Sequence, residues 1–318
     1  MLLDGKLQLR VHARRALTDD IQEFDLRPAD GAELPAILAG SSLIVQTPSG
    51  ELRNYSICND DTERHRYVIA VKRETASRGG SRSMHEGASE EAVLSAEVAR
   101  TGLRLAKGDG HLLIAGGIGI TPMLSLARRL LRGRDGDFKL IYLAKSRSEA
   151  AYADIILGPE FVENAICHFS AENGGRRLDL GPWLQDNGDG TNLYYCGPAG
   201  MMDAVRLGSI HWPRSHVHAE QFRKDGAGAI DNERFEIRQA KTGRVFRVRE
   251  DQTILDALRE AGLKPTASCE SGFCGKCRMR LVSGDADHRD MYLKREERAS
   301  AIMPCVSRAL GGVIELDF

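Results

Sequence analysis

The sequence lacks the features of membrane and secreted proteins. No stretch approaches the roughly 18 consecutive apolar residues that a membrane-spanning helix needs. The N-terminus, MLLDGKLQLRVHARR, has no long apolar segment and no small-residue cleavage site, so it does not resemble a signal peptide. We therefore expect a cytoplasmic protein that neither crosses nor binds a membrane.

An excess of charge of either sign is also absent. The chain has 44 Lys and Arg residues against 45 Asp and Glu residues, which gives a formal net charge of −1 at pH 7. Electrostatic attraction to nucleic acids or anionic membranes requires a basic excess. We therefore expect no nucleic-acid partner.

A disulfide framework is lacking as well. The chain has seven cysteines, an odd number, and four of them cluster toward the C-terminus. Disulfide-stabilised domains are usually short, secreted and carry an even number of cysteines. The pattern instead predicts metal ligation in a reducing compartment. Cys58 and Cys167 lie outside the cluster and are expected to be packing residues.

The chain is longer than one typical core, and its texture changes along its 318 residues. Residues 1–106 contain short alternating apolar runs between turns, which predicts a small antiparallel β-barrel. Residues 107–223 alternate apolar strands such as HLLIAGG with helical segments such as TPMLSLARRLLRG, typical of a parallel sheet covered by helices. Residues 224–232 are a predicted linker. Residues 233–318 begin with a predicted hairpin and the amphipathic helix TILDALREAGL.

The clustered cysteines have the spacing C-x4-C-x2-C, followed after 27 residues by the fourth. They are Cys269, Cys274, Cys277 and Cys305. This is the plant-type [2Fe–2S] spacing, in which four thiolates hold two irons. Gly272 and Gly275 permit turns that direct backbone N–H groups toward the cluster. A structural zinc site is the alternative, but such sites usually have two C-x2-C pairs and this chain has one.

Two motifs in the first region suit a flavin. RNYSICND (53–60) offers Arg53 as a positive charge for a phosphate, Tyr55 as a flat surface for a ring and Ser56 as a hydroxyl near a reactive nitrogen. A strand with a surface arginine is the simpler interpretation of this tetrapeptide. SRGGS (77–81) offers backbone donors to a phosphate, with a flexible surface turn as the alternative.

Two glycine-rich strand ends in the second region suit a dinucleotide. IAGGIGITPM (114–123) follows a strand and opens a helix, and Pro122 fits the first helical turn. It departs from the strict G-x-G-x-x-G fingerprint, so an ordinary strand–helix turn is the alternative. YYCGPAGMM (194–202) ends a second strand before another helix. Two such ends in one parallel sheet form a crevice in which ligands bind.

Arg-x-Tyr-Ser, Gly-Gly-x-Gly-x-Thr-Pro and Tyr-Cys-Gly-Pro, in this order and spacing, resemble the motifs of the ferredoxin–NADP⁺ reductase superfamily. With its C-terminal cysteine cluster, nearly the whole chain resembles the phthalate dioxygenase reductase family, which includes vanillate O-demethylase reductases. RYVIAVKRETASRGGSRSMH and DHRDMYLKREERASAIMPCVSRA are especially typical. The resemblance implies a multidomain fold: an antiparallel β-barrel flavin domain, a parallel α/β nicotinamide domain and a β-grasp plant-type ferredoxin domain.

The resemblance also implies FMN, NADH and a [2Fe–2S] cluster as cofactors. The protein would be the reductase component of a Rieske-type aromatic-ring dioxygenase or O-demethylase system. NADH would give hydride to FMN, and single electrons would pass through the cluster to the oxygenase. We expect a monomer that meets its oxygenase transiently. The SRGGS loop, with no evident adenine-stacking segment, favours FMN over FAD.

Two other functions compete with this one. A self-contained monooxygenase would need a haem or substrate domain, and no segment remains for it. A stand-alone electron carrier or redox-sensing iron–sulfur protein would leave both glycine-rich strand ends without a purpose. The nucleotide preference also has an alternative, because Lys145, Ser146 and Arg147 follow a parallel strand where a 2′-phosphate can bind. The family prefers NADH.

The family's functional residues transfer onto matching positions of this chain. For the flavin they are Arg53, Asn54, Tyr55, Ser56, Ala70, Val71, Lys72, Thr121 and Phe222, with Gly79, Gly80 and Ser81 at its phosphate. For the nicotinamide dinucleotide they are Gly116, Gly117, Pro122, Cys196, Gly197 and Pro198.

Ser56 and Cys196 are the predicted residues at the reacting atoms, with Cys196 packing near the nicotinamide and not acting as a nucleophile. We expect His218 and Glu220 to be ordinary polar residues. Glu270, Ser271 and Phe273 are expected to be exposed on the cysteine loop, where electrons would leave.

Overall fold

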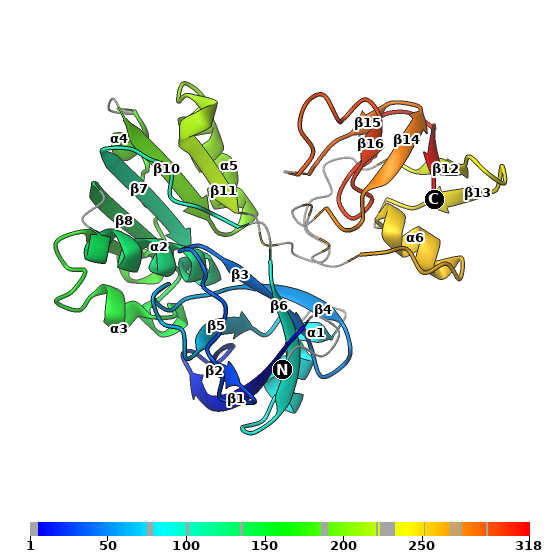
Figure 1. The fold of residues 1–318 in the computed structure, drawn as a ribbon. Coiled ribbons are helices and arrows are strands. Elements are labelled where there is room, and N and C mark those ends of the chain that lie inside the picture. Colours follow the sequence, from blue (N-terminus) through cyan, green and yellow to red (C-terminus); the bar gives the residue numbers. More distant parts are fainter. Residues whose placement is uncertain are drawn as a thin grey trace. The chain divides into compact units, whose positions relative to one another are not determined.

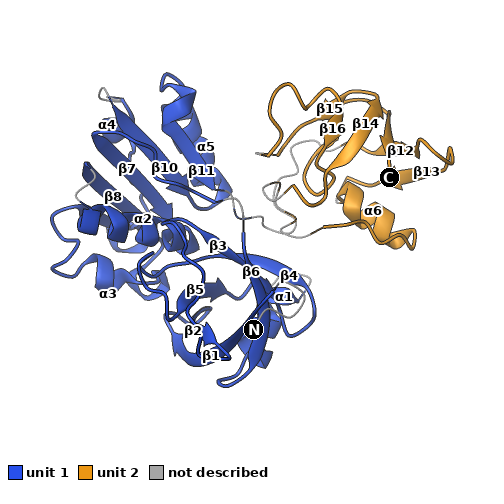
Figure 2. Cartoon of the chain, in the orientation of Figure 1, with its two compact units in different colours: residues 1–222 blue, residues 223–318 orange. Residues whose placement is uncertain are grey.

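A computed structural model describes most of the chain as two compact units, Met1–Phe222 and Arg223–Phe318 (Figure 2). The residues outside the description are 1–5, 75–78, 100–101, 134–135, 186–189, 221, 223–232, 251, 268–269, 271, 273–274 and 291. The predicted linker, 224–232, therefore lies outside the described residues. None of the helices in the described ranges has the length and apolar character needed to cross a membrane.

The first unit begins with a six-stranded antiparallel sheet in the order β4-β3-β6-β1-β2-β5 (Figure 1). Its elements are β1 (Leu7–Ala16), β2 (Ile21–Pro28), β3 (Ser42–Gln46), β4 (Leu52–Ser56), β5 (Tyr67–Lys72), α1 (Gly80–Gly87) and β6 (Val93–Val98). Alternate side chains such as Leu9 and Val11 are buried in one core. Ile57 and Ile69 form a bridge between the two outer edges, which closes the predicted barrel.

A five-stranded parallel sheet follows, in the order β11-β10-β7-β8-β9. Its strands are β7 (Gly110–Gly116), β8 (Asp137–Ala144), β9 (Ala165–Phe169), β10 (Thr191–Cys196) and β11 (Val217–Glu220). The longer helices are α2 (Ile120–Gly133) and α5 (Ala199–Gly208), and the shorter ones are η1 (Gly117–Gly119), η2 (Arg147–Glu149), α3 (Ala153–Ile156), η3 (Ser170–Asn173), α4 (Gly181–Leu184) and η4 (Arg214–His216).

Both faces of the parallel sheet are covered. Leu113 and Ala115 of β7 pack into one apolar cluster with α2, while Leu112 and Ile114 pack into another with α4 and α5. Successive strand residues point to opposite faces, so β7 must be apolar on both sides. This explains the continuous apolar run HLLIA in the sequence.

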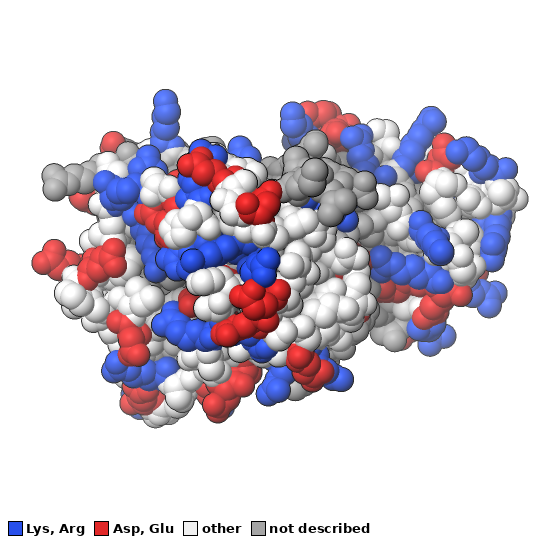
Figure 3. Space-filling model, turned by 60° about the horizontal axis from the view of Figure 1, so that its bottom comes forward, with Lys and Arg blue, Asp and Glu red and all other residues white. Residues whose placement is uncertain are grey.

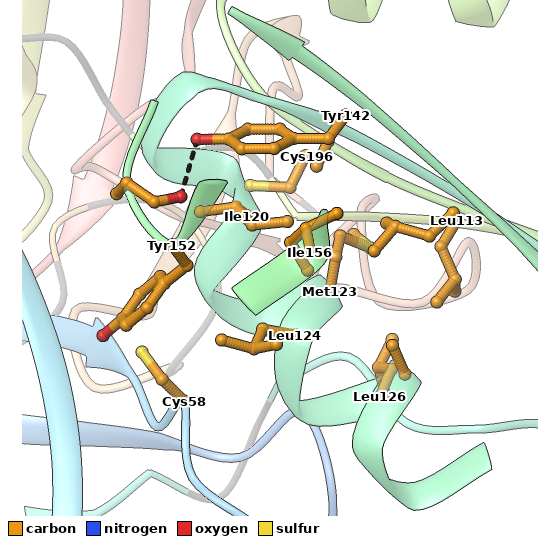
Figure 4. Packing of buried hydrophobic residues seen from close by; sticks show 14 of the residues in the cluster. Cys58, Leu113, Ile120, Met123, Leu124, Leu126, Tyr142, Tyr152, Ile156 and Cys196 are labelled. Atoms are coloured by element: carbon orange, nitrogen blue, oxygen red, sulfur yellow. Dashed lines mark hydrogen bonds between the residues drawn. The ribbon is translucent and has the colours of Figure 1, made fainter. Parts of the chain in front are cut away.

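The barrel and the parallel sheet share a core within the first unit. Cys58 from the barrel packs in one cluster with Met123 and Leu124 of α2 and with Tyr152 (Figure 4). Polar contacts add to this packing, because Arg128 Nη1 donates to the Cys58 carbonyl oxygen at 2.7 Å. The first unit is therefore one packed body, although its two sheets were predicted as separate domains.

The second unit contains a mixed five-stranded sheet in the order β13-β12-β18-β14-β16. Its elements are β12 (Phe235–Gln239), β13 (Val245–Val248), α6 (Ile254–Glu260), β14 (Met279–Ser283), β16 (Ala301–Ile302) and β18 (Val313–Asp317), with a small pair of β15 (Ala286–Asp287) and β17 (Arg308–Ala309). β12 runs parallel to β18 at the centre, and every other pair is antiparallel. This agrees with the predicted β-grasp fold. The predicted helix begins at a capping box formed by Thr253 and Asp256.

Replacing Arg128 with Met tests the contact between the barrel and α2. The Cys58 carbonyl would lose a charged donor, so we expect the free energy of unfolding of the first unit to fall by about 1–3 kcal/mol. Both tryptophans, Trp183 and Trp212, lie in this unit, so urea titration of their fluorescence measures it alone. Arg206, whose ion pair with Asp203 is exposed, provides the control Arg206→Met, with an effect within about 0.5 kcal/mol. Equal effects would contradict the assignment.

Candidate functional site

The end of β4 carries a row of buried polar atoms without hydrogen-bond partners in the described structure. These atoms are Arg53 Nη2, Asn54 Oδ1, the Tyr55 hydroxyl and the Ser56 hydroxyl. Leaving such a group unsatisfied costs about 1–3 kcal/mol, so four in succession indicate a place where a polar ligand binds. Burial raises the pKa of Tyr55, which keeps its hydroxyl protonated as a donor.

Arg53 lies against the first turn of α1. A Cβ added at Gly80 would lie 2.8 Å from Arg53 Nε, so the Arg53 side chain packs directly against this glycine. Gly79 caps α1 with a left-handed backbone, φ 105°, and no acidic residue stands in the first turn. The N-terminus of a helix favours anions. Arg53 and α1 therefore form a place suited to a phosphate, whereas Ser77 and Arg78 of the predicted loop lie outside the described residues.

The remaining predicted flavin residues occupy two neighbouring elements. Ala70 and Val71 of β5 are buried, and Lys72 Nζ lies 3.4 Å from Asp20 Oδ2. β5 contacts η1 at the end of β7, which brings the barrel to the parallel sheet. Thr121 is buried at the start of α2, where its hydroxyl donates to the Ile118 carbonyl at 3.0 Å.

Two further predicted residues complete the set. The Ser81 hydroxyl accepts from the Glu74 N–H at 3.1 Å, next to the first turn of α1. Phe222 is partly buried against the shared core.

The glycines at the ends of β7 and β10 have different roles. A Cβ at Gly116 would lie 2.7 Å from Pro198 Cδ, and one at Gly197 would lie 2.9 Å from Gly116 Cα. A Cβ at Gly119 would overlap the Cys196 carbonyl group. These three are required by packing between the strand ends, and the sequence reading did not assign Gly119. Gly117 has φ 54° and nothing within 4 Å of an added Cβ, so its surroundings are open to a ligand.

Glu220 lies beside both predicted residues of the reacting centre. It pairs with Cys196 across β10 and β11, and its side chain is buried. Burial raises the pKa of Glu220 to about 7, although the nearby Ser56 hydroxyl lowers it. Glu220 Oε2 has no hydrogen-bond partner in the described structure. A buried carboxyl that titrates near neutrality is typical of functional sites, so the expectation that Glu220 is an ordinary polar residue does not fit its surroundings.

Cys196 and His218 are the other predicted members of this group. Burial, followed by the negative charge of Glu220, raises the pKa of the Cys196 thiol well above its usual range. A thiol with a raised pKa is a poor nucleophile. His218 stacks on Tyr194 with ring centroids 4.7 Å apart, and burial lowers its pKa.

Carboxylates surround the predicted alternative site for a 2′-phosphate. Lys145 Nζ lies 3.5 Å from Glu149, and Arg147 Nη2 lies 2.8 Å from Asp154. The Glu172 side chain accepts from the Arg147 N–H at 3.1 Å. Ser146 and Arg147 line a cavity of about 640 Å³ that also reaches Arg15 of β1. The carboxylates therefore offset the positive charge that would attract a phosphate to these residues.

Arg177 is a basic residue near the start of α5 to which the sequence analysis gave no role. A Cβ added at Gly200, in the first turn of α5, would lie 3.8 Å from Arg177 Nη1. The guanidinium therefore stands beside the N-terminus of α5, directly after the Cys-Gly-Pro motif, where positive charge and backbone N–H groups combine. Arg177 comes from the segment between β9 and α4, and no local motif marks it.

The cysteine loop is described in part. Cys277 and Cys305 are buried in the core of the second unit, while Cys269 and Cys274 lie outside the described residues. Among the described residues no group of three possible metal ligands occurs, since two of the four cysteines are not among them. Gly272 and Gly275 have left-handed backbones, φ 79° and 74°, as the nest-like turn requires.

One expectation for this loop is wrong. Glu270 was expected to be exposed, but its side chain is only 13% exposed and lies 2.6 Å from Arg259 Nη2 of α6. The guanidinium draws the carboxylate onto the helix. Ser271 and Phe273 lie outside the described residues.

These sites define a class: a flavin- and nicotinamide-type reductase joined in one chain to an iron–sulfur domain. Residues 237–310 match the family model of the 2Fe-2S iron-sulfur cluster binding domain. Phthalate dioxygenase reductase of Burkholderia cepacia is 39% identical over 315 residues, covering 99% of this chain and 98% of the relative. Vanillate O-demethylase oxidoreductase of Pseudomonas sp. (strain HR199 / DSM 7063) is 35% identical, covering 98% and 99%.

A solved structure gives the same result. It is described as phthalate dioxygenase reductase, "a modular structure for electron transfer from pyridine nucleotides to [2Fe–2S]". It superposes with a TM-score of 0.78 at 38% identity, covering 99% of this chain and 98% of the solved one. This chain belongs to the phthalate dioxygenase reductase family. The resemblance inferred from the motifs and the three-part fold that it implied are both confirmed.

Replacing Glu220 with Gln tests the raised pKa of Glu220. A carboxyl whose pKa is about 7 when folded and 4.5 when unfolded costs stability as pH rises between these values. The variant lacks this cost, so we expect its stability relative to the wild type to rise by about 1–3 kcal/mol from pH 5 to pH 8. Urea titrations of tryptophan fluorescence at both pH values measure it. A difference that does not change with pH would contradict the assignment.

Proposed function

We propose that this chain is the NADH-dependent reductase component of a Rieske-type aromatic-ring dioxygenase or O-demethylase system, with FMN and one [2Fe–2S] cluster as cofactors. The observation that carries the proposal is the row of unpartnered polar atoms on β4, which lies in the same compact unit as the open strand end at Gly117. Bound FMN supplies the conversion between the two-electron chemistry of NADH and the one-electron chemistry of the cluster.

The flavin residues divide into a phosphate end and a ring end. Arg53 and the N-terminus of α1, with Gly79, Gly80 and Ser81, neutralise the phosphate. This single phosphate site supports FMN over FAD. The ring and the ribityl chain of FMN then contact β4, β5 and the residues that flank these strands. These residues are Asn54, Tyr55, Ser56, Ala70, Val71, Lys72, Thr121 and Phe222.

The nicotinamide dinucleotide takes the carboxyl edge of the parallel sheet. Gly117 leaves room for it, while Gly116, Gly197 and Pro198 keep the two strand ends tightly packed. Pro122 is buried in the first turn of α2. Arg177, with the N-terminus of α5, provides positive charge for the pyrophosphate. The carboxylates around Lys145 and Arg147 support NADH over NADPH, because they repel a 2′-phosphate.

Ser56 and Cys196 stand at the reacting atoms, and Glu220 supports both. At pH values below about 7 Glu220 holds a proton. Ser56 can then accept a hydrogen bond from the Glu220 carboxyl while its own hydroxyl donates to the ligand. Cys196 fills space as a neutral thiol and excludes water from this centre. Placement, not acid–base strength, is the main contribution of these residues.

Cys269, Cys274, Cys277 and Cys305 hold the cluster. The burial of Cys277 and Cys305 beside left-handed Gly272 and Gly275 fits a cluster bound inside the second unit. With these assignments, we propose four parts of the chain: a flavin domain (1–106), a nicotinamide domain (107–223), a linker (224–232) and an iron–sulfur domain (233–318).

We infer that the reductase is a monomer. It binds its oxygenase partner in a transient complex. On the face drawn in Figure 3, positive and negative side chains are interspersed, which supports modest electrostatic guidance and not a single-sign docking face. None of the described cysteines forms a disulfide, which supports a cytoplasmic location.

Anaerobic addition of NADH tests the proposed electron path. We expect the visible absorption of both flavin and cluster to bleach, because the chain holds both and connects them. Cys305→Ser removes a cluster ligand, so in this variant NADH should bleach the flavin alone. A wild-type chain in which only the flavin bleaches would refute the coupled path, and one with a cluster but no flavin would favour the stand-alone electron carrier.

Replacing Arg53 with Met tests the phosphate site. Loss of a charge-assisted contact to the FMN phosphate is expected to weaken FMN binding by about tenfold or more. Fluorescence titration of the flavin-free protein with FMN measures this, and titration with riboflavin, which has no phosphate, should show little change. Arg10→Met, in an exposed pair with Glu91, is the control. Equal losses for FMN and riboflavin would contradict the assignment.

A further inference from the structure

An ion pair in the second unit connects α6 to the cysteine loop. Arg259, in the last turn of α6, contacts Glu270, which directly follows the predicted ligand Cys269. Nη2 lies 2.6 Å from Oε1 and Nη1 lies 3.3 Å from Oε2, so the contact is bidentate. Exposure is 36% for the Arg259 side chain and 13% for that of Glu270. Such a two-pronged pair fixes geometry more firmly than a single surface contact.

Arg259 is itself oriented by its helix. Asp256 Oδ1 lies 3.8 Å from Arg259 Nη1, one turn earlier on α6. Asp256 also closes the capping box with Thr253, through Oδ2 at 3.1 Å from the Thr253 N–H. The Arg259 guanidinium that pairs with Glu270 thus belongs to a network of polar contacts that begins at the N-terminus of α6.

The backbone of Glu270 requires an anchor. Its φ is 51°, in the left-handed region that residues with a Cβ rarely adopt. Gly272 and Gly275 take the same region in the same loop, where glycine does so without a steric cost. A non-glycine residue keeps such a conformation only where its surroundings hold it. The bidentate contact with Arg259 holds the Glu270 side chain on α6.

We propose that Arg259 is a positioning residue for the iron–sulfur cluster. It holds Glu270 in the left-handed conformation beside Cys269 and neutralises the Glu270 carboxylate, so the pair controls both the retention of the cluster and its reduction potential. This inference rests on the proposed function, since it assumes a [2Fe–2S] cluster on the four cysteines.

Charge determines the sign of each effect on the potential. Reduction adds one negative charge to the cluster. Removing a nearby positive charge makes this added charge less favourable, and removing a nearby negative charge makes it more favourable. Arg259→Gln, which leaves the carboxylate, should therefore lower the midpoint potential. Glu270→Gln, which leaves the guanidinium, should raise it.

The measurement is a redox titration of the full chain, followed by the electron paramagnetic resonance signal of the reduced cluster. We expect each variant to change the ratio of reduced to oxidised cluster at a fixed potential by about threefold to tenfold, where tenfold corresponds to about 59 mV for one electron. The matched controls are Arg247→Gln and Glu236→Gln, from a pair in the same unit with side chains 89% and 39% exposed. We expect less than a twofold change in them.

Two further variants separate conformation from charge. Glu270→Gly accepts the left-handed backbone without an anchor, so iron and sulfide per chain should stay at the wild-type level while the potential rises as in Glu270→Gln. Glu270→Val, whose branched side chain is strained in this region, should lose the cluster. If Arg259→Gln retains no cluster, this supports the anchoring role, and Glu270→Gly still measures the charge effect.

Potential shifts of opposite sign for Arg259→Gln and Glu270→Gln, with unchanged controls, support the proposal. Shifts of the same sign, or shifts no larger than those of the controls, overturn the proposal. The proposed function still stands in that case, provided that the wild-type chain shows the signal of a [2Fe–2S] cluster. A wild-type chain with no [2Fe–2S] signal overturns both.

Discussion

The packing of the barrel against the carboxyl edge of the parallel sheet is the constraint on which the candidate active site depends. β5 of the barrel contacts η1 at the end of β7, and Arg128 of α2 donates to the Cys58 carbonyl oxygen of the barrel. Within the sheet, Gly119 lies so close to the Cys196 carbonyl group that a Cβ would overlap it. The shared apolar core holds the barrel in place against this edge. As a result, Ser56 from a barrel strand comes next to Glu220 from the last strand of the sheet, and both are buried.

The junction between the barrel and the sheet contains buried polar atoms that lack hydrogen-bond partners in the described structure. The polar atoms of β4 and Glu220 Oε2 cost stability in the protein alone, and a bound cofactor that satisfies them offsets the cost. The iron–sulfur region follows a different principle. Its core is separate, and the described part of its loop has left-handed backbones at Glu270, Gly272 and Gly275. Glu270, which is not glycine, is paired with Arg259 of α6. The two units therefore have separate cores and different local means of holding a ligand.

The sequence was sufficient for the fold class, the family and the motifs, because strand periodicity, glycine-rich strand ends and cysteine spacing are local patterns. It was not sufficient for features that depend on residues distant in the chain. Glu220 was underestimated because its burial comes from β4 and β10, and Glu270 was misplaced because its partner lies on a preceding helix. Arg177 reaches α5 from another segment, with no local signal. The glycine-rich motifs could be seen in the sequence, but the close packing of Gly116 and Gly197 between the strand ends could not.

The central claim is a division of labour: the first unit performs the flavin and nicotinamide chemistry, and the second carries the electrons away. Producing residues 1–222 alone and measuring bound FMN, bound iron and the rate of flavin reduction by NADH tests this most directly. The account predicts about one FMN per chain, no iron, and a flavin reduction rate within about twofold of the full chain. Failure of the folded fragment to bind FMN, or a flavin that NADH no longer reduces, would contradict it.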